Sequence, residues 1–190
     1  AALAAVVREV ANAPFGEGFM EATAHVIDWP ALHRNQCLSA LTGTGDDWIH
    51  NRNNVVLVLR EDGRVQYLPY STDINGGHPW YPNTPYDGGA TLAQRCAEDP
   101  TCRLEALTTC QDMVETFEAL DVSTSVIDER CTALTEAGFA RTPDAVVCES
   151  MKSFYAARPE ALRAELADLI SKIGQPGDTS DTGGPVVGPK

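Results

Sequence analysis

Two short apolar runs joined by a tight turn constrain this chain more than any other feature. The runs are Val55 to Leu59 and Val65 to Tyr70, both rich in β-branched or aromatic residues, and Glu61-Asp62-Gly63 lies between them. This pattern predicts a β-hairpin, because Gly63 can supply the positive φ that a tight turn needs. A three-residue loop at 61–63 places Arg60 opposite Arg64, so paired residues have numbers that sum to 124.

Extension of this register beyond the apolar runs places Asn51 beside Asp73. Neighbouring strands lie about 4.8 Å apart, so side chains at the open end of the hairpin can reach one ion. Mg²⁺ and Mn²⁺ prefer oxygen ligands of this kind, completed by water and phosphate oxygens. The hairpin therefore predicts a metal site at Asn51 and Asp73.

An aspartate precedes this pair at a spacing that suggests catalysis. Asp46 and Asn51 form Asp-x-x-x-x-Asn, the spacing that separates the base from a metal-binding Asn in protein-kinase catalytic loops. Asp46 is the candidate base. The alternative is that Asp46, Asp47 and Asn51 are turn-forming residues before a strand.

The segment from Asp46 to Gly77 resembles the spore-coat protein H (CotH) kinase family. That family carries an Asp, an aromatic residue two positions on, an Asn-x-Asn-Asn stretch, a hairpin and a Pro-Trp-Asp-x-Asp motif. The matching residues are Asp46, Trp48, Asn51-Arg52-Asn53-Asn54 and Pro69-Tyr70-Ser71-Thr72-Asp73. Tyr70 and Ser71 stand where the family has the Trp and the first Asp of its last motif.

The resemblance implies an α+β, mainly helical fold: the large lobe of a protein kinase, with a hairpin carrying the catalytic loop and the metal-binding Asp. It implies a secreted enzyme that uses Mg or Mn with ATP and transfers the γ-phosphate to Ser or Thr of a coat or extracellular protein. Asp46 would be the catalytic base, and Asn51 and Asp73 would hold the metal. The partner lobe that covers the nucleotide is expected outside this chain, because no Lys precedes residue 152.

Other interpretations of these residues stay open. His50 either contacts the phosphate or metal beside Asn51, or merely hydrogen-bonds backbone. Ser71 cannot supply the missing charge, which favours an inactive pseudokinase or a structural module of a cell surface or spore coat. His78 offers a rival metal ligand, which leaves a metal-dependent hydrolase as a third class.

Charge excludes one class of partner. The formal net charge is −13, and the three Lys at 152, 172 and 190 are widely separated. A nucleic-acid partner requires a basic stripe that neutralises phosphates, and this sequence has none. Nucleic acid is therefore not expected as a partner.

Six cysteines indicate disulfide bonding. They show no C-x-x-C pair, which argues against a zinc knuckle, and five of them lie between residues 96 and 148. An even number in an acidic chain favours bridges in an oxidising compartment, and hence a secreted, cell-surface or spore-coat protein; buried free thiols are the alternative. Cys96 and Cys102 flank a helix break at Asp99-Pro100 and are the first pair expected.

Helical periodicity accounts for most of the remaining chain. A helix should begin at Asp28-Trp29-Pro30 and end at Gly43. Further helices are predicted over Thr91–Glu98, Thr101–Leu120, Ser123–Ala137, Asp144–Arg158 and Pro159–Ile173. Residues 1–173 thus form the helical lobe and residues 174–190 a disordered linker or tail. No segment approaches the ~20 apolar residues of a membrane span, so none is predicted.

Overall fold

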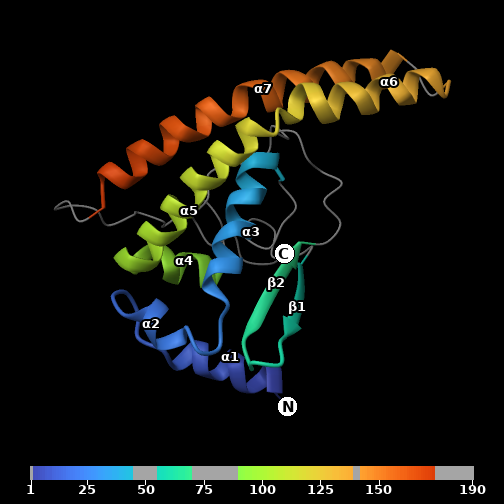
Figure 1. Ribbon diagram of the computed structural model, residues 1–190. Helices are drawn as coiled ribbons and strands as arrows, with labels where there is room; N and C mark the ends of the chain where they lie inside the picture. Colours follow the sequence, from blue (N-terminus) through green and yellow to red (C-terminus); the bar gives the residue numbers. More distant parts are fainter. Residues whose placement is uncertain (1, 45–54, 70–89, 139–141, 174–190) are drawn as a thin grey trace, which may run out of the picture.

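The computed structural model describes residues 2–44, 55–69, 90–138 and 142–173 (Figure 1). Within these ranges the protein is mainly helical with a two-stranded antiparallel sheet, so the predicted α+β class is confirmed. The strands are β1 (Val55–Leu59) and β2 (Val65–Pro69). The helices are α1 (Ala2–Asn12), α2 (Phe19–Thr23), α3 (Trp29–Thr42), α4 (Thr91–Glu98), α5 (Pro100–Ala119), the π-helical segment η1 (Val122–Asp128), α6 (Glu129–Glu136) and α7 (Thr142–Ser171).

The hairpin has the predicted register. Val55 lies opposite Pro69 and Leu59 opposite Val65, and every pair between them also sums to 124. The Arg60 amide donates to the Arg64 carbonyl at 2.9 Å, and Gly63 closes the turn with a φ of 84°. The turn chemistry and the two apolar runs therefore agree with the observed pairing.

Helix α3 begins and ends where the sequence predicts. The Asp28 carboxylate caps it by accepting from the Ala31 amide at 3.3 Å, and Pro30 occupies its first turn. Gly43, with a φ of 62°, ends it. The helix lies alongside α5 and also contacts β2 and α7, so it is the element around which the fold is built (Figure 1).

Two apolar clusters form the core, one at each half of α3. The first lies between α1, α2, the start of α3, β2 and α4, and includes Val6, Phe19, Ile27, Trp29, Leu32, Val65, Ala93 and Cys96. The second lies between the end of α3, α5 and α7, and consists of Cys37, Ala40, Leu41, Leu107, Cys110, Val114, Leu162 and Leu166. No helix in the described ranges has both the length and the apolar character that crossing a membrane requires.

All six cysteines are paired. Cys96–Cys102 joins α4 to α5, which confirms the pair predicted first. Cys37–Cys110 joins α3 to α5, and Cys131–Cys148 joins α6 to α7. Three disulfides are typical of a protein from an oxidising, extracellular compartment.

The predicted helix break at Arg158-Pro159 is wrong, because α7 continues through Pro159. Proline lacks an amide hydrogen and removes one bond of the helical ladder. Here Tyr155 and Arg158 on one side of Pro159, and Leu162 on the other, are all buried. Packing on both sides keeps the helix continuous across the missing bond.

The helix predicted over 123–137 is α-helical only from Glu129. Asp121 adopts a left-handed conformation with a φ of 44°, and the wider segment η1 follows it. The Ser125 hydroxyl donates to the carbonyls of Leu120 and Asp121, at 2.8 and 2.7 Å. Such bonds from a serine side chain compete with the regular α-helical ladder, which sequence periodicity does not reveal.

Candidate functional site

The predicted site residues Asp46, His50, Asn51 and Asp73 lie outside the described residues, as do Ser71 and His78. Their roles therefore stay predictions. The structure does describe the elements that flank them in the sequence, which are α3 and the two strands of the hairpin.

The end of α3 is held by α7. The buried Arg158 donates through Nε to the Ala40 carbonyl at 2.8 Å, and the Tyr155 hydroxyl donates to the Thr42 carbonyl at 3.4 Å. A cation at the carboxyl end of a helix also complements the helix dipole. Burial lowers the pKa of Arg158, and the nearby Glu165 carboxylate partly offsets that effect. The backbone carbonyls six and four residues before Asp46 are thus held by side chains of α7.

The hairpin is held by the same helix and the residues just before it. The Asn35 side chain donates to the Tyr67 carbonyl at 3.0 Å. Val65 exchanges backbone hydrogen bonds with Val26 and Asp28, at 2.7 and 3.0 Å. Arg60 pairs with the buried Asp28 carboxylate, the cap of α3. Helix α3 and the residues just before it therefore hold the described part of the hairpin, residues 55–69.

An apolar hollow of about 260 Å³ lies between α1, the hairpin and α4. Its walls include Val7, Leu57, Tyr67 and Leu92, and Arg95 is the charged residue among them. The Arg95 guanidinium is already engaged by carbonyls of the α1 end, including that of Pro14 at 2.8 Å, and lies 4.3 Å from the Phe19 ring centre. The described residues of its walls include no carboxylate, so they offer neither a ligand for a hard metal nor a carboxylate base.

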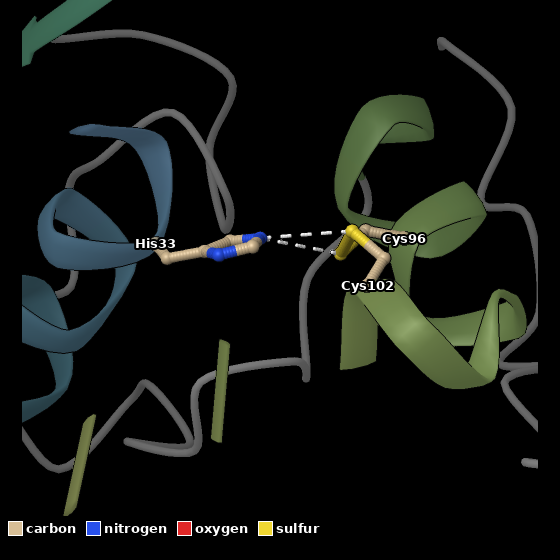
Figure 2. Close-up of side chains that lie close together, drawn as sticks. All are labelled: His33, Cys96 and Cys102. Atoms are coloured by element: carbon tan, nitrogen blue, oxygen red, sulfur yellow. Dashed lines mark hydrogen bonds between the residues drawn. A yellow bond between two sulfur atoms is a disulfide. The ribbon is translucent and has the colours of Figure 1, made fainter. Parts of the chain in front are cut away.

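A second cluster joins a buried histidine to a disulfide. The nitrogen edge of the His33 ring points from α3 at the Cys96–Cys102 bridge, as Figure 2 shows, with Nε2 3.8 Å from the Cys96 sulfur and 3.6 Å from that of Cys102. Burial, and to a lesser extent the charge of Arg34, lowers the pKa of His33 to about 4. The imidazole is therefore neutral at physiological pH.

The sequence patterns do not single out His33, Asn35, Tyr155 or Arg158. The signal for His33 was available in the spacing of α3. Trp29 and Leu32 mark its buried face, and His33 is four positions after Trp29. No comparable signal identifies Arg158, because its partners depend on how α7 crosses α3.

Comparison with known proteins gives no independent identification. No protein-family model matches the chain, and no curated protein matches it.

Proposed function

We propose that this chain is the helical lobe of a kinase-like phosphotransferase that resembles the spore-coat protein H family. Asp46 would accept the proton of a Ser or Thr hydroxyl on a secreted or coat protein. Asn51 and Asp73 would hold Mg²⁺ or Mn²⁺ against the ATP phosphates, with His50 beside them. An upper lobe supplied elsewhere would cover the nucleotide.

The observation that carries this proposal is the hairpin register. Its pairs sum to 124 from Leu59–Val65 to Val55–Pro69, and continuation of the same rule by four further pairs reaches Asn51 and Asp73. The strands are anchored on α3 through Asn35, and α3 also leads to Asp46. In the proposed site α3 would position both the metal-binding pair and the base, which in-line phosphoryl transfer needs because that reaction depends on positioning.

The test compares two adjacent aspartates in the protein joined to its upper lobe. Asp46→Asn should cut the rate of phosphotransfer from ATP by about 10²- to 10⁴-fold, the usual effect of losing a general base. Metal and nucleotide binding should stay nearly unchanged. Asp47→Asn is the matched control and should be tolerated; the reverse pattern would shift the assigned roles by one residue and defeat the proposal as stated.

The second candidate is an inactive pseudokinase or structural module of a cell surface or spore coat. Ser71 favours it, since the family has a metal-binding carboxylate at that position. Ser71→Asp distinguishes the two. An active enzyme should bind Mn²⁺ more tightly after the change and keep its turnover, whereas a structural module should show no phosphotransfer before or after it.

A further inference from the structure

The His33 cluster has the composition of a soft-metal site. One imidazole nitrogen and two sulfurs, each from a buried residue, come within 4.8 Å of one another. In the structure the sulfurs are bonded to each other (Figure 2). Their lone pairs are therefore not available to a cation in the way those of free thiolates would be.

The geometry fits zinc once that bond is opened. Zn–S and Zn–N distances of about 2.3 and 2.0 Å at a tetrahedral angle place nitrogen and sulfur about 3.6 Å apart. His33 Nε2 already lies 3.6 Å from the Cys102 sulfur and 3.8 Å from that of Cys96. The imidazole needs almost no movement; only the sulfurs must separate, to about 3.8 Å for two thiolates on one zinc.

Charge and burial also favour Zn²⁺. Cys96, Cys102 and His33 are each no more than 1% exposed. Two thiolates and one neutral imidazole around Zn²⁺ give a complex without net charge, which a buried position tolerates far better than a lone ion.

A buried amide lies one turn beyond His33 on α3. Gln36 follows His33 by three positions on α3, so it lies on the same side of the helix. Its side-chain nitrogen and oxygen are both buried and have no hydrogen-bond partner within the part of the chain that the structure describes. An amide buried without a partner is costly, so a water or polar group near this turn of α3 would stabilise it.

The two cysteines are held in place by more than their bridge. The buried Asp99 carboxylate accepts from the Thr101 and Cys102 amides at 2.9 and 3.4 Å, and from the Met20 amide at 2.8 Å. Cys96 and Cys102 are 6 residues apart in the sequence, whereas Cys37 and Cys110 are 73 apart. A disulfide that closes a shorter loop restricts the unfolded chain less, so opening Cys96–Cys102 should cost less stability than opening Cys37–Cys110. The α4–α5 corner should keep its shape after reduction.

We propose that reduction of Cys96–Cys102 converts this cluster into a zinc site formed by His33, Cys96 and Cys102. A phosphine reductant adds two electrons to the sulfur–sulfur bond and becomes a phosphine oxide with the oxygen of one water, whose two protons go to the thiols. Zn²⁺ then displaces both protons and binds the two thiolates and His33 Nε2. The site is independent of the proposed phosphotransfer.

The test uses the full chain, reduced by a water-soluble phosphine without denaturant, with and without one equivalent of Zn²⁺. Native mass spectrometry should show one bound zinc. Alkylation followed by peptide mapping should show Cys96 and Cys102 protected by zinc. His33→Gln should weaken zinc binding at least about tenfold, since even an outer-shell change commonly costs that much. His25→Gln, at an exposed histidine, is the matched control and should bind zinc as the natural chain does.

Three results would overturn the proposal. One is that the reduced natural chain takes up no zinc, or unfolds once Cys96–Cys102 opens. Another is that zinc protects Cys37 and Cys110, or Cys131 and Cys148, in place of the predicted pair. The third is equal zinc affinity in the natural chain and in His33→Gln. Because the first two are read from the natural chain, they stand even if the variant fails to fold.

Discussion

The core around α3 and the helical arm at the far end of α7 are stabilised by different means. In the core, Leu32, Leu107 and Leu166 are completely buried. The arm consists of η1, α6 and the neighbouring part of α7. In Figure 1, α6 and this part of α7 run side by side and extend away from α3. No residue of α6 is buried, and Cys131–Cys148 joins it to α7. Side-chain burial thus fixes the region that supports the candidate site, while a covalent bridge fixes the arm.

The largest difference between the two regions should appear on truncating a leucine in each. Leu166→Ala removes a completely buried side chain and should lower the free energy of unfolding by about 2–5 kcal/mol. Leu134→Ala in α6, where the side chain is 51% exposed, is the control and should change it by less than about 0.5 kcal/mol. Chemical denaturation measures both; similar values would mean that the arm has a buried interface of its own.

His33 should make the core sensitive to pH. Its pKa is about 4 in the folded protein and 6.5 in the unfolded chain, so only the unfolded chain takes up a proton between these values. The stability that the folded protein gains by keeping His33 neutral is fully lost by about pH 4 and fully present above pH 6.5. The free energy of unfolding should therefore fall by up to about 3 kcal/mol as the pH drops between these values. The free energies of unfolding of the oxidised natural chain and of His33→Asn should differ less at pH 4 than at pH 7. A constant difference would show that His33 titrates normally.

Arg158 should matter less than the apolar core but more than an exposed cation. Arg158→Met keeps the stem of the side chain and removes the bonds to Ala40 and Glu165, which should cost about 1.5–3 kcal/mol. Arg163→Met is the matched control, because Arg163 is 47% exposed in its pair with Glu118 and should contribute less to stability than Arg158. Equal losses in thermal melts would contradict a buried role for Arg158.

The smallest effect on global unfolding should come from the bridge of the arm. With Cys131 and Cys148 both replaced by Ser, the amides of α6 should exchange hydrogen much faster, because few buried contacts hold that helix. The amides of α3 and α5 should keep their protection. Loss of protection in α3 as well would show that the arm and the core unfold as one unit.

Helix caps, turn residues and short spacings in the sequence made several elements of this fold predictable. The register of the hairpin, both ends of α3, the bounds of α4 and the Cys96–Cys102 pair all follow from caps, turns and short spacings. The continuity of α7 through Pro159 does not, because it depends on contacts with α3 and α5 that are distant in sequence. For the same reason no local pattern indicates that Arg158 supports the end of α3, or that His33 faces a disulfide.

The most direct test of the proposed site is Mn²⁺ binding by the chain itself, followed by electron paramagnetic resonance. One weak site is expected, and Asp73→Asn should abolish it by removing its main charge. Asp62→Asn is the control, since the Asp62 carboxylate is already engaged by the Arg64 amide and guanidinium at the hairpin turn. Loss of Mn²⁺ binding in Asp73→Asn but not in Asp62→Asn is the predicted result. Unchanged Mn²⁺ binding in Asp73→Asn would contradict a metal site at the open end of the hairpin.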